Sequence, residues 1–228
     1  MSEWWTYRPA DLLMFSPVTF YRLFELHNAA VWPAQIAALI AGCAILGLIL
    51  WRPHGAGRTI AALLALAWGF VAWAYFADRY SGINLAAPYF AWIFGAQAAL
   101  LLLSGTAAGR LIFTAPLGPL QKLGLALLVF ALLLQPLIGP LLGRPWTGME
   151  IFGITPDPTV LATLGALVAA DRLRWEFLPI PLLWCAVTGA TLWTMGSPEA
   201  LLMPAAVLIA LALAVLRGLV KPHRRAPN

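Results

Sequence analysis

Charge is scarce in this sequence. Charged residues make up only 10% of the 228 residues, whereas hydrophobic residues make up 62%. A soluble domain of this length has too little polar surface to cover so much apolar material. The composition therefore excludes a soluble globular protein and indicates a membrane protein.

Cysteine is also scarce, which excludes a disulfide framework. The two cysteines, Cys43 and Cys185, fall near the middle of predicted spans at matching depths. If they faced each other, they could pass a soft metal such as Cu(I) or a mercuric ion. No Cys-x-x-Cys motif, methionine-rich run or histidine within a span supports this reading. We therefore expect both cysteines to act as small, buried apolar residues.

Lysine and histidine are nearly absent from the apolar runs. The two lysines, Lys122 and Lys221, lie outside the last run, so the Schiff-base site of a retinal protein is missing. The three histidines lie outside all the runs, which removes axial ligands for a haem held between spans. No phosphate loop, nucleophile elbow, zinc-protease motif or cleavable signal is recognisable. We expect no cofactor and no enzymatic activity.

What the sequence does contain is a series of long apolar runs. Seven of them predict transmembrane helices: 33–51, 59–77, 85–104, 120–142, 158–170, 176–195 and 197–217. No low-complexity linker divides them, so the predicted fold is one all-α, seven-span membrane bundle. We divide the chain into an N-terminal interfacial segment (1–32), the membrane domain (33–219) and a basic tail (220–228).

The N-terminal segment predicts a helix lying in the membrane interface. Trp4, Trp5 and Tyr7 are ring types that settle among lipid headgroups. Ser16-Pro17 favours a helix start. Apolar residues then recur at helical spacing at Phe20, Leu23, Phe24 and His27.

The distribution of basic residues predicts the orientation. The loops after runs one, three and five, together with the tail, carry ten of the 14 lysines and arginines, and the other side carries four. Seven of the nine acids lie on that other side, which gives it a net charge of −3 (4 − 7) against +8 (10 − 2). The positive-inside rule places the N-terminus outside and the C-terminus in the cytoplasm.

The fifth run is too short to cross a membrane alone. Asp157 is a suitable N-cap and Pro158 a suitable first residue for its helix. Thirteen residues reach about 20 Å, against about 30 Å of hydrocarbon. We expect the polar segment before this helix to lie at partial depth, where irregular backbone persists only inside protein or beside water.

Acidic residues on the predicted outer side are the candidate ion-binding or transport residues. They are Glu150 and Asp157 around the short helix, and Asp78, Glu25 and the nearby His27. Carboxylates at partial membrane depth often mark ion or proton paths, and broken helices form transporter sites. Two simpler readings compete: Asp157 only caps its helix, and Asp78 forms a solvated pair with Arg79.

Four segments carry a family resemblance. Trp4–Tyr7, Leu13–Pro17, Glu25–Pro33 and Glu150–Thr159 resemble the signatures of a bacterial family of polytopic inner-membrane proteins of unknown function. The resemblance covers the whole chain. It implies a bacterial inner membrane as the location and implies no mechanism.

Two classes of function follow from these observations. One is a small transporter or channel for a cation or small polar solute, entered from the acidic outer face. The other is a non-catalytic accessory or assembly subunit of a larger membrane complex. A cavity reaching Asp157 would favour the first, and an exposed apolar groove the second. The expected partners are the lipid bilayer and either further copies of the chain or other membrane subunits, and no nucleic acid.

Overall fold

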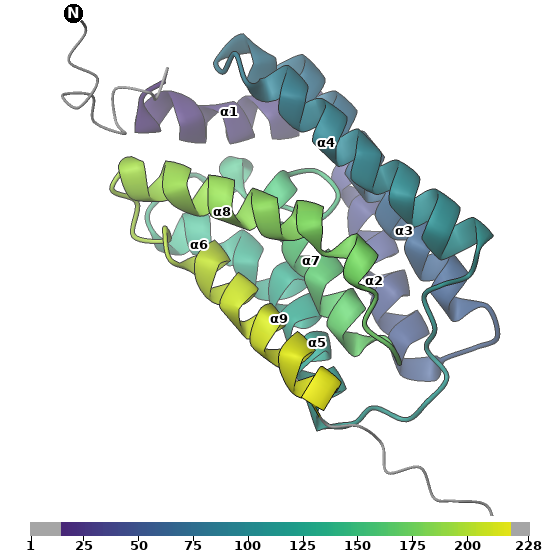
Figure 1. Ribbon diagram of the computed structural model, residues 1–228. Coiled ribbons are helices and arrows are strands. Elements are labelled where there is room, and N and C mark those ends of the chain that lie inside the picture. Colours follow the sequence, from purple (N-terminus) through teal and green to yellow (C-terminus); the bar gives the residue numbers. More distant parts are fainter. Residues whose placement is uncertain (1–14, 220–228) are drawn as a thin grey trace, which may run out of the picture.

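The computed structural model describes residues 15–219, and within that range all regular structure is helical (Figure 1). The α-helices are α1 (Pro17–Ala30), α2 (Ala34–Trp51), α3 (Ala56–Phe70), α4 (Ala87–Leu100), α5 (Pro119–Val129), α6 (Gln135–Leu141), α7 (Pro156–Ala169), α8 (Pro179–Thr194) and α9 (Leu202–Leu219). Wider, π-helical turns form η3 (Val71–Arg79), η5 (Leu101–Ala107) and η6 (Phe130–Leu134). Short 3-10 turns form η4 (Tyr80–Gly82), η7 (Trp146–Gly148) and η8 (Trp175–Phe177).

Among the residues that the structure describes, five helices, not seven, are long and apolar enough to cross a membrane. They are Ala34–Trp51, Ala56–Gly82, Ala87–Ala107, Pro119–Leu141 and Trp175–Thr194. The prediction of seven spans is therefore wrong at the fifth and seventh runs. The fifth is α7, whose 14 residues are too few. The seventh starts late, at Leu202 rather than Ser197, because the residues before it form turns; its described apolar part is Leu202–Ala212.

A proline explains one of the π-helical turns. Pro136 has no N–H, and its ring would crowd the carbonyl of Leu132, four residues earlier. The helix responds by widening over Phe130–Leu134 before α6 begins at Gln135. The widened turn lies directly before Gln135, a buried polar residue.

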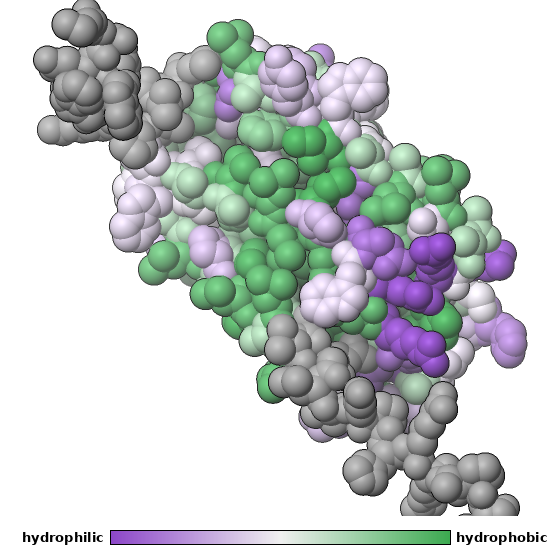
Figure 2. Space-filling view, viewed as in Figure 1, coloured by the Kyte–Doolittle hydropathy of each residue, from purple (hydrophilic) through white to green (hydrophobic). Residues whose placement is uncertain are grey.

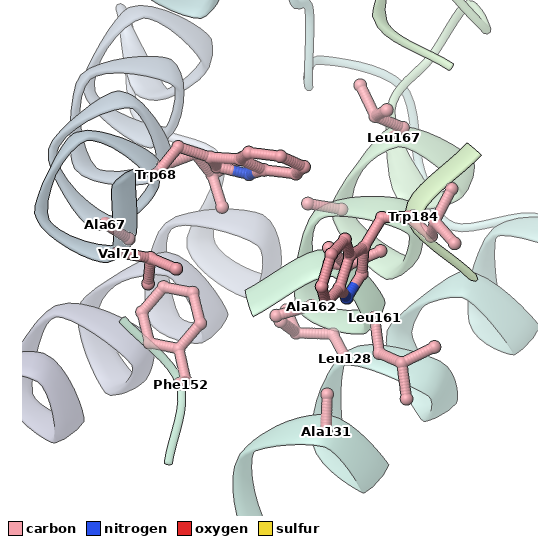
Figure 3. Packing of buried hydrophobic residues seen from close by; sticks show 14 of the residues in the cluster. Ala67, Trp68, Val71, Leu128, Ala131, Phe152, Leu161, Ala162, Leu167 and Trp184 are labelled. Atoms are coloured by element: carbon pink, nitrogen blue, oxygen red, sulfur yellow. The ribbon is translucent and has the colours of Figure 1, made fainter. Parts of the chain in front are cut away.

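The short helix α7 is the centre of the molecule. Every residue from Ile151 to Ala170 is buried, so the irregular backbone directly before the helix lies inside protein, which is one of the two surroundings expected for it. Its depth in a membrane stays a prediction. α7 contacts α5, α8, α9, η6 and α3. Figure 3 shows Trp68 from α3 and Trp184 from α8 pointing toward this helix from different sides. Burial on all sides explains why α7 carries no charged residue after Asp157 and is apolar apart from its threonines.

Two glycines allow α5 and α7 to cross with their backbones in contact. A Cβ atom on Gly165 of α7 would lie 2.5 Å from the Leu128 nitrogen and 2.8 Å from the Gly124 oxygen. A Cβ atom on Gly124 of α5 would lie 2.8 Å from the Gly165 oxygen. Small residues at such crossings are typical of membrane helix packing.

The buried hydroxyl groups along α7 all have partners. Thr155, Thr159 and Thr163 each donate to the carbonyl oxygen four residues earlier. Thr163 also accepts a 2.8 Å hydrogen bond from Trp68 Nε1, which ties α7 to α3. These polar residues are therefore part of the packing.

The loops gather at the two ends of the bundle as the predicted topology requires. At the basic end, Arg110 pairs with Glu176 across 3.3 Å, which joins two of the three loops placed on one side. At the acidic end, Asn28 donates to the carbonyl oxygens of Thr147 and Met149. Figure 2 shows hydrophilic side chains at lower right, where α2 ends and α3 begins, and a mainly apolar surface beyond them. Which end faces the cytoplasm stays a prediction.

Helix α1 covers the acidic end (Figure 1). Its predicted apolar face is confirmed, because Phe20, Leu23, Phe24 and His27 are all buried. Ser16 caps the helix by accepting from the Thr19 amide, as the Ser-Pro start predicts. The interfacial position of α1 stays a prediction, and Trp4, Trp5, Tyr7 and the basic tail lie outside the described residues.

Candidate functional site

Asp157 does not cap its helix, contrary to one of the two readings of the sequence. Helix α7 begins at Pro156, and the preceding residue, Thr155, makes no side-chain capping bond. The Asp157 carboxylate instead accepts 2.7 Å from Trp184 Nε1 and 3.2 Å from Thr188 Oγ1, both on α8. Because Asp157 stands inside the first turn, its side chain points sideways to α8 rather than back over the helix end.

Two small cavities meet at Glu150 and Asp157, and both residues line both of them. The larger, of about 50 Å³, lies beneath α1 and is walled mainly by aromatic rings, among them Phe24, Tyr75 and Trp184. The smaller, of about 20 Å³, is bordered by polar residues from α6, the α6–α7 connection, the first turn of α7 and the α8–α9 connection. By volume, the first has room for a few water molecules and the second for one.

Of the three carboxylates that line the two cavities, Glu150 is the one without a hydrogen bond or ion pair among the described residues. It is half-buried. Burial, and after it the Asp157 carboxylate, raises the pKa of the Glu150 carboxyl well above its usual range, while Arg144 opposes that rise. An ionised Glu150 at this position is therefore stabilised by a cation beside it.

A third carboxylate, Glu199, borders the smaller cavity and is already paired. Arg144 Nη1 lies 2.7 Å from Glu199 Oε1, and both side chains are largely buried. The Tyr21 hydroxyl donates to the same oxygen at 3.1 Å, and Arg144 stacks over the Tyr21 ring at 4.2 Å. One guanidinium thus faces three carboxylates, which leaves this wall with a net charge of −2 (1 − 3) when all three are ionised.

Two oxygens on the smaller cavity have no partner. Gln135 is 6% exposed, and its Oε1 makes no hydrogen bond; Glu199 Oε2 is likewise buried and unpaired. Both residues line the cavity. Arg144, which lines the same cavity, has a buried Nε–H that is also without a partner. Buried polar atoms are nearly always satisfied in native proteins, so unpaired acceptors beside an unpaired donor indicate a partner that both donates and accepts, such as an ordered water molecule.

The other predicted site residues lie away from this cluster. Asp78 is exposed at the end of η3, and Glu25 is paired with Arg22 on α1. His27 is fully buried, with Nε2 3.1 Å from the Ile154 carbonyl oxygen and its ring against Tyr75. Of the five candidates, the structure brings together only Glu150 and Asp157, and none of the other three lines either cavity.

The two cysteines do not form a facing pair. Cys43 is exposed on the outside of α2, whereas Cys185 is buried in α8. The expectation that both are buried is therefore wrong for Cys43, because α2 presents most of its surface outward. Within residues 15–219, no three His, Cys, Asp or Glu side chains are grouped closely enough to hold a metal ion.

Sequence reasoning missed Gln135, Arg144, Glu199, Trp184 and Thr188. A partial signal existed for Arg144 and Glu199, since they carry opposite charges in loops assigned to the same side. Gln135 also had one, as a polar residue inside an apolar span directly before a proline. Nothing local distinguishes Trp184 or Thr188 from other residues of α8.

Comparison with known proteins identifies the family. No curated protein and no solved structure matches the chain. Residues 18–225 match the profile of a family of unknown function, DUF6064. The match includes every described residue except the first three, Phe15, Ser16 and Pro17. The match therefore covers the whole candidate site, and the chain belongs to the DUF6064 family.

Proposed function

We propose that this protein is a small membrane transporter or channel for a cation or small polar solute. The solute enters at the acidic end of the bundle and binds at Glu150 and Asp157. The observation that carries the proposal is the unpaired Glu150 carboxylate, which lines two cavities with Asp157 beneath α1. Carboxylates held inside a membrane domain are costly, and proteins retain them chiefly where ions or protons move.

The position of α7 supports the same proposal. Its N-terminus begins inside the bundle, directly after a buried irregular segment, as in the discontinuous helices that bind ions in secondary transporters. The proposal places the protein in a bacterial inner membrane, as the family resemblance implies. The acidic end then lies outside and the C-terminus in the cytoplasm, as the count of basic residues predicts.

Flux measurements on reconstituted protein test this function. Proteoliposomes with an imposed sodium, potassium or proton gradient should dissipate at least one of them faster than protein-free vesicles. Glu150→Gln and Asp157→Asn each remove a charge at nearly constant shape, and each should reduce that flux at least tenfold. Asp78→Asn is the matched control, because Asp78 is exposed and lines neither cavity. Undiminished flux through the Glu150→Gln, Asp157→Asn double variant would refute the proposal.

One observation favours the alternative, an accessory subunit of a membrane complex. An apolar groove of about 450 Å³ lies between α2 and α3, floored by Phe152 and Gly153 and walled by small residues such as Ala37 and Ala41. Small-residue grooves accept a neighbouring membrane helix closely. Under this alternative, Ala37→Phe should reduce the size of the native complex on blue-native gels while leaving flux unchanged.

A further inference from the structure

The smaller cavity suits a water molecule better than a metal ion. Its volume of about 20 Å³ admits one water molecule. Its walls hold two buried, unpaired acceptors, Gln135 Oε1 and Glu199 Oε2, and one buried, unpaired donor, the Nε–H of Arg144. A metal ion accepts no hydrogen bond, so it would leave this N–H unpaired and next to a second positive charge. A water molecule donates to both oxygens and accepts from Arg144.

The hydrogen bonds around this water leave room for one more donor. A water molecule makes up to four hydrogen bonds, two as donor and two as acceptor. Gln135 and Glu199 take both of its protons, and Arg144 takes one of its two lone pairs. The remaining polar side chains on the cavity wall are Glu150 and Asp157. An ionised carboxylate only accepts, whereas a protonated carboxyl donates, so one of these two acids completes the set when it is protonated.

The surroundings of the two acids indicate which one holds the proton. Asp157 accepts from Trp184 on one oxygen and from Thr188 on the other, and such donors stabilise the ionised form. Glu150 accepts from no described residue, and burial raises the pKa of its carboxyl. Two acids whose surroundings differ in this way divide the roles of proton carrier and fixed charge. Glu150 is therefore the carrier.

The other ionisable side chains that line the two cavities or cover them from α1 are paired or neutral at pH 7. The ion pairs are Arg144 with Glu199, and Arg22 with Glu25. The neutral tyrosines, whose phenols ionise near pH 10, are Tyr21, Tyr75 and Tyr80. His27 is also neutral, because burial lowers its pKa to about 4. None of these groups competes with Glu150 for a proton at neutral pH.

We propose that the ion bound at this site is a proton, which Glu150 carries and exchanges with one water molecule in the smaller cavity. Glu150 also lines the larger cavity, which has room for a few water molecules. A hydronium ion there gives a proton to a Glu150 oxygen and becomes water, one O–H bond breaking as the carboxyl O–H bond forms. When the carboxyl bond breaks in turn, the proton passes to the water in the smaller cavity and the carboxylate is restored. This inference deepens the proposed function and rests on it for the role of the proton in transport.

Infrared spectroscopy of the purified full-length protein tests the inference without measuring transport. A protonated carboxyl has a C=O stretching band that a carboxylate lacks. At pH 7, in a detergent without carbonyl groups, wild-type protein should show this band, and the band should shift in D₂O because a carboxyl beside water exchanges its proton. Glu150→Gln should remove the band. Asp78→Asn, a change at an exposed acid that lines neither cavity, is the matched control and should keep it.

Proteoliposomes test the role of the proton in transport. With the membrane potential clamped by valinomycin and equal potassium on both sides, an imposed pH gradient should dissipate equally fast with and without sodium. Glu150→Gln should slow this dissipation at least tenfold. Gln135→Leu should slow it as well but keep the infrared band, because it removes an acceptor for the water and not the proton carrier.

Gln97→Leu is the matched control for Gln135→Leu. Gln97 is also buried with an unpaired Oε1, but it donates to the Phe177 carbonyl oxygen and lines neither cavity. Its replacement should leave both the band and the proton flux unchanged. If Gln135→Leu does not fold, the infrared band of wild-type protein and its loss in Glu150→Gln still decide the inference.

The results distinguish this inference from the proposed function. A Glu150 band that shifts in D₂O, with no flux of any ion or solute in vesicles, supports the proton site and refutes transport. Cation flux without a protonated carboxyl band at pH 7 refutes the inference and leaves the proposed function standing. A band that persists in Glu150→Gln, or one that does not shift in D₂O, also overturns the inference.

Discussion

The indole nitrogen of Trp184 donates a 2.7 Å hydrogen bond to the carboxylate of Asp157, and this bond joins α8 to the first turn of α7. Thr188, one helical turn further along α8, donates to the other carboxylate oxygen at 3.2 Å. The two bonds hold the Asp157 side chain between the cavities. A substitution can therefore remove the negative charge of this side chain while keeping atoms that form these bonds.

That separation gives the first prediction. Asp157→Asn should fold, because the amide oxygen still accepts from Trp184 and the Thr188 hydroxyl can accept from the amide nitrogen. The loss of charged hydrogen bonds should cost about 1 kcal/mol of unfolding free energy. Asp157→Leu leaves the indole N–H without an acceptor and should cost about 1–3 kcal/mol. Melting curves in detergent check both values, and equal stability of the two variants would contradict the prediction.

The crossing of α5 and α7 gives the second prediction. Gly165→Ala places a methyl group 2.5 Å from the Leu128 nitrogen, which is backbone and cannot move without displacing the helix. We expect a loss of about 1–3 kcal/mol. Gly95→Ala on α4 is the control, because a Cβ there meets nothing within 4 Å. It should be neutral or slightly stabilising, since alanine favours helix more than glycine does. A stable Gly165→Ala variant would show that the helices do not cross this closely.

The hydrogen bond from Trp68 to Thr163 gives the third. Thr163→Val keeps the shape of the side chain but removes the only acceptor recorded for the buried Trp68 Nε1 among the described residues. The unfolding free energy should fall by about 1–3 kcal/mol. Thr163→Ser keeps the hydroxyl and should recover most of that loss. Thermal melting of the two variants side by side is the measurement, and similar melting temperatures would argue against the bond.

His27 gives a prediction about pH. Burial, with Arg79 adding to it, lowers the pKa of His27 to about 4, although the hydrogen bond to Ile154 and the charge of Asp78 act in the opposite direction. The folded state therefore binds the proton less readily than the unfolded state does. The contribution of His27 should be constant above the unfolded pKa of about 6.5 and become destabilising as pH falls toward 4.

Stability measured between pH 7.5 and 4 tests this expectation. Below the unfolded pKa of about 6.5 and down to pH 4, wild-type protein should lose up to about 1.4 kcal/mol per pH unit through His27, and above pH 6.5 this loss should be absent. His27→Gln should lose this component of the dependence, whereas His54→Gln, a change at an exposed histidine, should keep it. A wild-type curve identical to that of His27→Gln would show that His27 does not resist protonation.

The orientation gives the last prediction. Gly82 lies at the acidic end, and a Cβ there meets nothing within 4 Å. In a Cys43→Ala background, Gly82→Cys should react with an impermeant thiol reagent added outside intact cells, and His54→Cys, at the basic end, should react only after permeabilisation. The reverse pattern would invert the topology. The buried Cys185 should stay unlabelled in both variants.

Features that depend on local composition could be predicted from the amino-acid sequence alone. The apolar runs predicted the all-helical class and, to within a few residues, the bounds of the spans Ala34–Trp51, Ala87–Ala107 and Pro119–Leu141. In an apolar environment a helix satisfies the backbone hydrogen bonds within its own segment. The count of basic residues sorted the loops into the two groups that the structure brings to opposite ends. The shortness of the fifth run placed attention on Glu150 and Asp157, and these two are the candidates that lie together.

The partners of these residues depend on how the helices pack against one another. Asp157 looks like a cap in the sequence, but α8 packs beside it and its carboxylate accepts from Trp184 and Thr188 instead. Glu199 reads as the start of a helix, but Arg144, 55 positions earlier (199 − 144), holds it in the wall of a cavity. Run lengths and charges are properties of short segments, whereas partners so distant along the chain are set by how the helices pack around α7. The spacing of residues along the sequence therefore does not predict which of them become partners.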